Sequence, residues 1–408
     1  MNPNQKRPLF RKKVLIKGNC LFLVGPIGTF FARLSSYLED NNVRTYKIIF
    51  PLHEYGFPKS RIIKYEQEIV GFKNFLKNTI VNYEIKHVFM YGNVLIPHKQ
   101  ALDLVKELDK EGINIKTHIF ELGYLRPNFV TLENEGINYN SGLIKSRGFY
   151  LKQDSYTNLP IPKKHARFRI RKIWKSISFI NHSFKNYKIV ESEHKLQPKP
   201  IYVWFQIKGF FLKYYFWFKE YKFKKYFVNK KYFLVILQVS TDSQLTAGSN
   251  FKSNNKFIYK VIKDFAKANQ DNCNLVFKHH PRDRGYTNYH HLIKKISKEF
   301  GVFNKVFYFH DYYLSKLFQN SNCKGTVLIN STVGYQSLYH SVPVKPLGIT
   351  PYNIEGLSDQ KDLISFFKNP STVDRLLFKK FYKYVLENSQ INGNFDGYFP
   401  FDKVFVFK

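Results

Sequence analysis

A carboxylate stands where a buried apolar run ends in the first third of the chain. The stretch FELGYLRPNFVTLENEG, residues 120–136, continues the run NIKTHIF, and Glu121 is its first charged residue. A carboxylate at a strand end can act as a nucleophile or as a general base, or it can simply fix the loop by hydrogen bonds. Arg126 can bind a carboxylate through two parallel hydrogen bonds, or pair at the surface with Glu133 or Glu135. We expect Glu133 and Glu135 to cap or order the following loop.

A second group of chemically capable residues follows the apolar run NLVF. The stretch KHHPRDRG begins where that run ends, and Pro281 stiffens the exit of the chain. Its basic residues are Lys278, His279, His280, Arg282 and Arg284. Several cationic groups at one strand end predict an anion site.

Two further strand ends carry polar groups. After TVLIN, Ser331 or Thr332 is suited to cap the next helix, whose free N–H groups favour phosphate, so that Asn330, Ser331 and Thr332 can cradle one. A capped helix that binds nothing is the alternative. After FLVILQV, Gln238 and Asp242 form what in isolation is a polar turn. Three neighbouring strand ends with such groups together favour a binding site.

The elements that must position these residues alternate between strand and helix. Short apolar runs and helical spacing of apolar residues predict an N-terminal Rossmann-like domain over 1–150 and a second one over 232–408. Between them, 151–231 is crowded with Lys, Phe, Tyr and Trp and predicts amphipathic helices. These helices either lie in a membrane interface or pack between the domains with their lysines reaching outward. The expected fold class is α/β.

Composition narrows the classes of function. A chain of 408 residues is too long for a single hydrophobic core, so we expect two domains. Its net charge of +35 attracts nucleic acid, anionic lipid or a phosphorylated substrate. Compositional drift of the genome explains part of this charge equally well. The turn GPIG is not GxGxxG, and GxxxxGK[ST], HExxH and CxxC are absent, so we expect no nicotinamide cofactor, no ordinary P-loop and no metal. We also expect no secretion signal and no membrane span.

The motifs in this order resemble a known family. FLVGPIGTFFARLSSYL, FELGYLRPNFVTLENEGIN, FKHHPRDRG and INSTVGYQSLYHSVPVKPLG are similar to capsule polysaccharide biosynthesis proteins of the Kdo-transferase type, called KpsS-like or LipB-like. The resemblance implies a GT-B-like enzyme with two Rossmann-like parallel-sheet domains facing a central cleft. It implies transfer of β-Kdo from CMP-Kdo to a phosphatidylglycerol-type lipid. One departure is that Gly92 is followed by Asn93, where members of the family usually have aspartate.

The residues and the resemblance together suggest roles for individual positions, and the resemblance assigns His280 and Pro281 to the leaving phosphate. The catalytic candidates are Glu121, Asp242 and His280, with Glu121 as nucleophile or as base, in which case Asp242 faces the sugar. The donor-binding candidates are Lys278, His279, Pro281, Asn330, Ser331, Thr332, Gln238 and Arg126. On the acceptor side the loop candidates are Gly25, Pro26, Gly123 and Tyr124.

The expected partners are a CMP-sugar donor, an anionic phospholipid acceptor, the inner-membrane surface and other capsule assembly and export proteins. We expect no cofactor and a cytoplasmic protein, peripheral on the inner face of the cytoplasmic membrane. The alternatives are a transferase using another CMP-sugar such as sialic acid, an enzyme adding a later sugar, and a non-catalytic glycolipid-binding component of export. A nucleic-acid-binding protein would share the basic charge, but no RRM, KH or zinc-finger signature is present.

Overall fold

The chain folds into two compact units that are not contiguous in sequence. The computed structural model describes residues 13–26, 28–50, 57, 61–157, 159, 199–221, 230–240, 244–270 and 272–408. Unit 1 comprises Met1–Leu143, Tyr156–Glu193 and Tyr382–Lys408, and unit 2 comprises Ile144–Ser155 and His194–Phe381. The last 27 residues were expected in the second domain and instead belong to the first.

In the described part of the chain, unit 1 contains a seven-stranded sheet of order β13-β7-β6-β5-β2-β3-β4. Its strands are β2 (Asn19–Phe22), β3 (Thr45–Ile49), β4 (Ile62–Lys64), β5 (Ile85–Tyr91), β6 (Lys116–Leu122), β7 (Phe129–Glu133) and β13 (Gln390–Asn392). The five strands from β4 to β6 are parallel, and their spatial order is the 3-2-1-4-5 of a Rossmann half. The order reverses between β2 and β5.

Two antiparallel strands that the sequence analysis did not predict extend this sheet. β7 turns back beside β6, and β13 pairs with β7 from the far end of the chain. The C-terminal segment returns because its apolar side chains complete the core: Ile391, Phe399 and Val404 are buried in the same cluster as Phe30 and Phe120. This burial is the physical reason for the corrected domain boundary.

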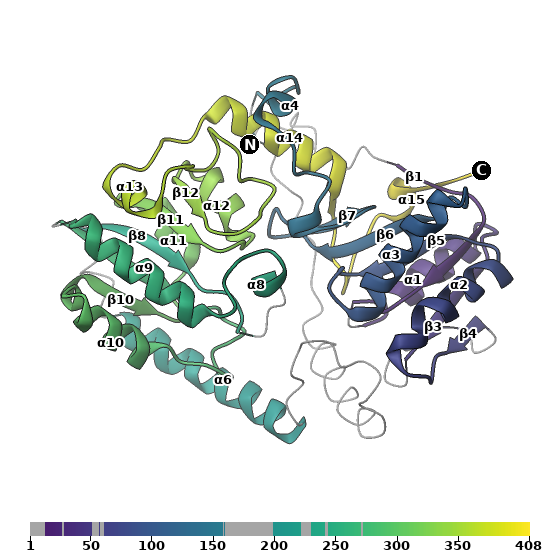
Figure 1. The fold of residues 1–408 in the computed structure, drawn as a ribbon, viewed down its shortest axis with the longest axis horizontal. Helices are drawn as coiled ribbons and strands as arrows, with labels where there is room; N and C mark the ends of the chain where they lie inside the picture. The colour runs from purple at the N-terminus through teal and green to yellow at the C-terminus, as the bar shows by residue number, and fades with distance from the viewer. Residues whose placement is uncertain are drawn as a thin grey trace. The chain divides into compact units, whose positions relative to one another are not determined.

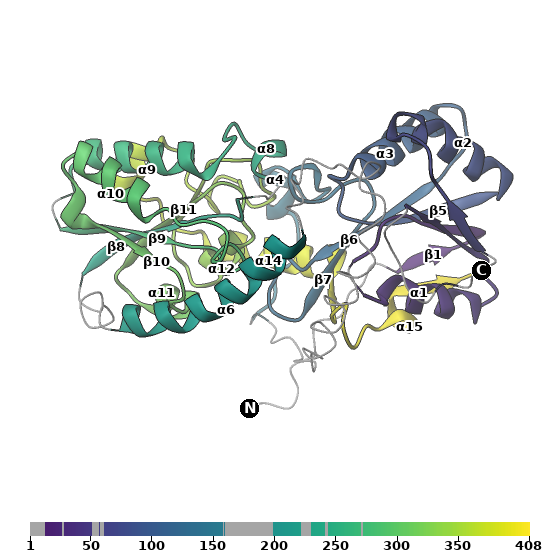
Figure 2. The same ribbon diagram turned by 90° about the horizontal axis from the view of Figure 1, so that it is seen from below.

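Helices cover both faces of the unit 1 sheet, as Figure 2 shows, with α2 and α3 on one side and α1 and α15 on the other. Their bounds are α1 (Phe30–Glu39), α2 (Phe72–Asn82), α3 (Ile96–Lys110) and α15 (Phe401–Val404), with short 3-10 turns η2 (Ile69–Gly71) and η3 (Asn138–Asn140). The helical spacing of Phe30, Phe31, Leu34 and Leu38 puts all four side chains in the core. A separate two-stranded sheet pairs β1 (Val14–Ile16) with β14 (Phe405–Phe407).

The described part of unit 2 contains a five-stranded sheet in which every strand is parallel, of order β10-β9-β8-β11-β12. Its strands are β8 (Lys231–Ile236), β9 (Cys273–Lys278), β10 (Val306–Phe309), β11 (Cys323–Leu328) and β12 (Val344–Pro346). The order is again 3-2-1-4-5, with the reversal between β8 and β11. The predicted α/β class with two Rossmann-like domains is therefore confirmed.

Helices also flank this second sheet (Figure 1), with α9 and α10 on one face and α6 and α11 on the other (Figure 2). The helices of unit 2 are α4 (Arg147–Leu151), α6 (Lys199–Tyr221), α8 (Gln244–Ala247), α9 (Asn254–Ala268), α10 (His290–Glu299), α11 (Leu314–Gln319), α12 (Val333–Tyr339) and α13 (Leu363–Lys368), with the 3-10 turn η4 (Phe303–Lys305). α14 (Arg375–Ser389) leads from unit 2 back into unit 1.

The return of the chain to unit 1 can be tested at Gln390, which is fully buried. Its Oε1 accepts hydrogen bonds from the backbone N–H groups of Tyr124 and Leu125, at 2.9 and 3.3 Å. Gln390→Ala leaves buried donors without this acceptor, so we expect the free energy of unfolding of unit 1 to fall by about 2 kcal/mol in urea titrations. The exposed Gln67→Ala is the matched control, with a change below about 0.5 kcal/mol. Equal losses for the two variants would contradict this account.

Candidate active site

Two predicted donor-binding residues meet at the centre of the unit 2 sheet. Gln238 follows β8 and Asn330 follows β11, and these neighbouring strands are the ones between which the strand order reverses. The Gln238 Nε2 donates to the Asn330 Oδ1 at 2.8 Å, and the Asn330 N–H donates back to the Gln238 Oε1 at 3.4 Å. Open α/β sheets bind their ligands beyond the carboxyl ends of the strands at this reversal. The hydrogen-bonded pair therefore lines the position where a ligand is expected.

The start of α12 lies beside this pair. The Ser331 Oγ accepts a hydrogen bond from the backbone N–H of Val333 at 3.3 Å, whereas Thr332 makes no capping bond with its side chain. The Tyr352 hydroxyl donates to the Ser331 carbonyl at 2.6 Å, and a Cβ at Gly334 would stand 2.2 Å from the Tyr352 ring. Packing against this tyrosine thus fixes the half-buried corner of Ser331 and Thr332.

The turn after β9 carries His280 at the same end of the sheet. His280 is half-buried, and its Nδ1 accepts from the backbone N–H of Arg282 at 3.2 Å. The buried Asp283 accepts from the Ser240 hydroxyl at 2.8 Å, from the Ser240 N–H at 3.1 Å and from the Thr287 hydroxyl at 2.6 Å. Asp283 therefore ties the turn after β9 to the turn after β8. The sequence offered no signal for this role, since Asp283 stands in a run of charges that looks like a surface.

A hollow of about 460 Å³ opens beside these two turns, at the amino ends of α9 and α10. Its lining consists of Ser240, Ser253, Asn254, Asn255, Thr287, Asn288, Tyr289 and Leu292. The Asn254 Nδ2 donates to the Gln238 carbonyl at 2.8 Å and to the Tyr289 hydroxyl at 3.0 Å. The hollow is thus connected by hydrogen bonds to the residues that follow β8.

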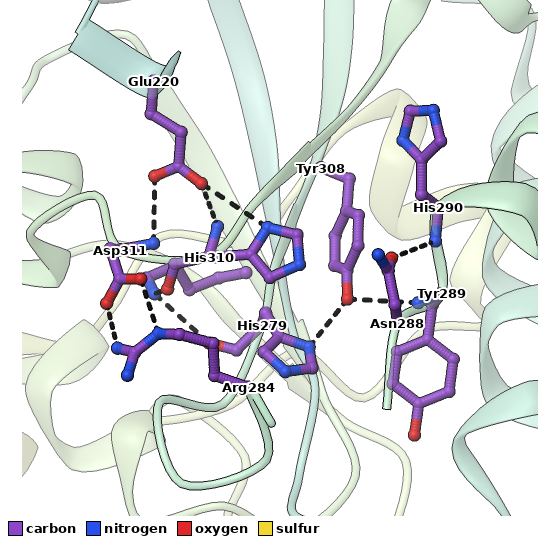
Figure 3. Close-up of polar contacts among 10 residues, drawn as sticks. Glu220, His279, Arg284, Asn288, Tyr289, His290, Tyr308, His310 and Asp311 are labelled. Carbon is purple, nitrogen blue, oxygen red and sulfur yellow. Dashed lines mark hydrogen bonds and ion pairs between the residues drawn. The ribbon is translucent and has the colours of Figure 1, made fainter. Parts of the chain in front are cut away.

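Two of the cations predicted to bind an anion instead point into unit 2. Lys278, the last residue of β9, is buried, and its Nζ donates to the carbonyls of His279, at 3.2 Å, and His310. The Arg284 guanidinium pairs with the Asp311 carboxylate, with Nε 2.6 Å from Oδ2 (Figure 3). Buried cations need such partners, and two of them, His310 and Asp311, lie on the segment after β10. Lys278 and Arg284 are therefore structural groups in this conformation.

The same interior cluster holds His279 and His310 (Figure 3). The His279 Nδ1 lies 2.7 Å from the Tyr308 hydroxyl, and burial lowers the pKa of His279 to about 3. Burial also lowers the pKa of His310, although Glu220 opposes this with a carboxylate oxygen 3.6 Å from the His310 Nδ1. His279 was predicted to bind the donor, but its side chain is only 1% exposed. It packs beneath the turn, and the adjacent Pro281 is exposed.

In unit 1 the Glu121 carboxylate is held at the end of β6. The Tyr91 hydroxyl donates to the Glu121 Oε1 at 3.0 Å, and the N–H of Leu122 donates to the same oxygen at 2.8 Å. Gly92 lies beside the carboxylate, with the Glu121 Oε2 3.8 Å from the point where a Cβ would stand, and its φ of +74° is a conformation that favours glycine. Glu121 is half-buried. Tyr91, which ends the neighbouring β5, is a positioning residue that the sequence reading did not identify.

Glu133 orders the loop after β7, as expected. Its buried carboxylate accepts from the Tyr124 hydroxyl at 2.8 Å, from the Ser141 hydroxyl at 2.6 Å and from the Gly142 N–H at 3.1 Å. Tyr124 was predicted for the acceptor side, but it is buried and its hydroxyl also accepts from the N–H of Asn138 at 2.7 Å. Its position within the core therefore makes Tyr124 a structural residue.

The two glycine-bearing turns of unit 1 are shaped by close packing. A Cβ at Gly25 would stand 2.6 Å from the ring of Phe31, and one at Gly123 would stand 2.4 Å from the carbonyl oxygen of Phe129. The proline after Gly25 is buried. Arg126 is exposed, and its Nε donates to the Gly123 carbonyl at 3.0 Å. Of these predicted residues, Arg126 is the one whose charged group is accessible from solvent.

Asp242, the remaining catalytic candidate, lies outside the described residues. Within the described ranges, no group of three or more His, Cys, Asp or Glu side chains is arranged to hold a metal ion. Nor does any helix there have the length and apolar character needed to cross a membrane.

Comparison with known proteins gives a consistent family match. The model of the family described as capsule polysaccharide biosynthesis protein matches residues 94–396. The chain is 31% identical to the capsule polysaccharide modification protein LipB of Neisseria meningitidis serogroup A, over 92% of this chain and 91% of that protein. It is also 31% identical to the capsule polysaccharide export protein KpsS of Escherichia coli, over 93% and 97%. Among solved structures it is similar to the KpsC β-Kdo 2,7 transferase of Thermosulfurimonas dismutans, with 12% identity, coverage of 90% and 99%, and a TM-score of 0.41.

The burial of Lys278 predicts a pH dependence of stability. Burial lowers the pKa of Lys278 from 10.5 to about 8, so between these values the unfolded chain binds more protons at this residue than the folded chain does. The free energy of unfolding therefore rises with pH in this window. Relative to Lys278→Met, the wild type should gain about 2 kcal/mol between pH 7.5 and 10 in urea titrations. Between pH 6 and 7.5 the difference should stay constant, and a flat difference over the whole range would contradict the buried, charged lysine.

Proposed function

The chain belongs to the capsule polysaccharide biosynthesis protein family, and from this premise we propose that it is a glycosyltransferase that transfers β-Kdo from CMP-Kdo to a phosphatidylglycerol-type lipid. The observation that carries the proposal is the half-buried Glu121 carboxylate at the end of β6, oriented by the hydroxyl of Tyr91 and the backbone N–H of Leu122. A carboxylate held in this way suits the oxocarbenium-like transition state of a sugar transfer.

Unit 2 is proposed to bind the donor. CMP leaves as a phosphate dianion, and donors preorganised around that charge lower the barrier to its departure. His280 and the corner of Ser331 and Thr332 are the candidate donors, since they follow β9 and β11 at one end of the sheet. The hollow beside Ser240 and Asn254 is the candidate site for the nucleoside. Lys278 is assigned a supporting role, holding the backbone of the segment after β10.

In the proposed retaining reaction, a Glu121 oxygen forms a bond to the anomeric carbon of Kdo as the bond from that carbon to the CMP oxygen breaks. The acceptor hydroxyl then attacks the same carbon, the bond to Glu121 breaks, and the hydroxyl proton passes to a base. If Glu121 is instead the base for the acceptor hydroxyl, Asp242 is the candidate carboxylate toward the sugar. Incubation with CMP-Kdo alone separates the two roles, because only a nucleophile at position 121 adds one Kdo to that residue in peptide mass spectra.

The transfer itself is tested with purified protein, CMP-Kdo and lyso-phosphatidylglycerol, followed by mass spectrometry of the lipid. We expect the lipid to gain one Kdo. Glu121→Gln preserves the shape of the side chain but removes its charge, and turnover should fall about 10³-fold. The matched control is Glu135→Gln, which alters an exposed carboxylate beyond β7 and should leave turnover unchanged.

The other outcomes distinguish the alternatives. Transfer from CMP-sialic acid, and not from CMP-Kdo, would identify a different donor. Binding of CMP by folded protein without any product would favour a non-catalytic glycolipid-binding component of export. Full turnover by Glu121→Gln would exclude Glu121 from either catalytic role. In the proposed setting the protein works on the inner face of the cytoplasmic membrane, next to other capsule assembly and export proteins.

A further inference from the structure

Helix α6 has one narrow buried stripe along its described length. Gly209, Phe216 and Glu220 are buried, at spacings of seven and four residues that keep them on one side of the helix. Most of the other described side chains of the helix are apolar or aromatic and exposed, which for a helix of a water-soluble unit calls for a partner on that surface.

The buried stripe fastens α6 to the turn that carries His280. A Cβ at Gly285 would stand 2.0 Å from the Phe205 carbonyl oxygen, so only glycine allows this approach. The Arg284 Nη1 donates to the Gly209 carbonyl at 3.2 Å. These contacts join the first half of α6 directly to the segment that follows His280.

The second half of α6 is fastened to the segment after β10. The ring of Phe216 stacks on His310 with centroids 3.5 Å apart. The Glu220 carboxylate accepts the backbone N–H groups of His310 and, at 2.9 Å, Asp311 (Figure 3). A helix held at both halves by buried contacts is a fixed part of unit 2.

The opposite side of α6 is an exposed aromatic and basic surface, which we call the α6 face. Its members are Trp204, Ile207, Lys208, Phe210, Phe211, Lys213, Tyr214, Tyr215, Trp217, Phe218, Lys219 and Tyr221. Phe211 and Phe218 are 66% and 68% exposed, and Trp204 is 61% exposed. The α6 face has three lysines and no acidic residue, because the single carboxylate of its helix, Glu220, belongs to the buried stripe.

We propose that the α6 face lies in the headgroup region of an anionic lipid bilayer, with the helix parallel to the membrane plane. Trp, Tyr and Phe side chains with interspersed lysines are the composition that this region favours, since the rings enter the acyl boundary and the ammonium groups meet anionic headgroups. The Lys213 and Lys219 ammonium groups lie over the rings of Tyr214 and Tyr215, 5.6 Å from the centroids. Cation and ring therefore reach the same surface together.

The charge pattern favours lipid over a protein partner. At the angular spacing of an α-helix, Lys208, Lys213 and Lys219 lie along the borders of the α6 face, next to the buried stripe, and its centre is apolar and aromatic. This arrangement lets the central rings enter the acyl boundary while the bordering ammonium groups reach anionic headgroups, and no acidic residue of the face opposes them. The buried stripe also prevents insertion across the bilayer, since it is committed to unit 2.

This inference deepens the proposed function, and the following consequence rests on that function. The buried side of the helix that meets the membrane contacts the turn in which His280 lies. Membrane binding would then present the donor-binding turns of unit 2 at the surface where a lipid acceptor lies. The membrane binding itself is independent of any catalysis.

The test uses the full chain and vesicles without donor or acceptor turnover. Two of the three tryptophans, Trp204 and Trp217, lie on the α6 face, and Trp174→Phe removes the third, which is outside the described residues. In this background, vesicles of phosphatidylglycerol and phosphatidylethanolamine with brominated acyl chains should quench the tryptophan fluorescence. Pure phosphatidylcholine vesicles with the same brominated chains should quench it at least tenfold less at equal lipid concentration.

Variants of the α6 face should weaken co-sedimentation with the phosphatidylglycerol vesicles. Phe211→Ser with Phe218→Ser should lower the affinity at least tenfold, and each of Lys208→Gln, Lys213→Gln and Lys219→Gln should lower it roughly fivefold. The matched control is Tyr259→Ser with Phe303→Ser, which removes two exposed aromatic rings beside α9 and α10, on the other face of the sheet, and should leave binding unchanged.

Three results would overturn the inference. The first is absence of quenching by the anionic vesicles, and the second is undiminished vesicle binding by the α6 variants. The third is a dimer in sedimentation analysis that dissociates when Phe211→Ser and Phe218→Ser are combined. That dimer would identify a second copy of the chain as the occupant of the α6 face. Turnover of a water-soluble acceptor without vesicle binding would overturn the membrane inference alone. Vesicle binding without any transfer would overturn the proposed function alone.

Discussion

The strand order of the two parallel sheets is the constraint on which the candidate site depends. Each sheet starts at its centre, grows toward one edge and then restarts on the other side, so two strands distant in sequence become neighbours. The helices that follow them leave in opposite directions, and the residues between strand and helix are left at the reversal. In unit 2 this brings Gln238 and Asn330, 92 residues apart, within hydrogen-bond distance. The chemistry of the site is therefore assembled by topology rather than by local sequence.

Much of this could be predicted because apolar runs reveal strands and the residues after a parallel strand emerge at a common end. Gln238, His280 and Asn330 were identified in this way. The direction of a side chain at that end could not be predicted, because it depends on partners elsewhere in the chain. The sequence predicted Lys278 and Arg284 to be anion ligands, but the segment after β10 supplies groups that hold both side chains in the interior of unit 2. The antiparallel pair of β7 and β13 escaped prediction for the same reason, since its partners are about 260 residues apart.

Unit 2 buries several charged side chains. The Arg284–Asp311 pair, Lys278 and Glu220 are all withdrawn from solvent, which costs free energy unless every group finds a partner. Here the partners are largely backbone carbonyls and N–H groups of two turns, so the charges fix the path of the main chain. A loop held by such contacts keeps the residues it displays, His280 among them, in a defined geometry.

The return of Tyr382–Lys408 to unit 1 has a consequence for biosynthesis. A ribosome releases the segment from His194 to Phe381 before the strand that completes the first sheet, so the second half of the chain has all its β-strands while the first still lacks an edge. The earlier-made unit 1 therefore cannot complete its sheet or cover all of its aromatic interior until the end of the chain has been made. Premature termination within these last residues would damage the amino-terminal half of the molecule.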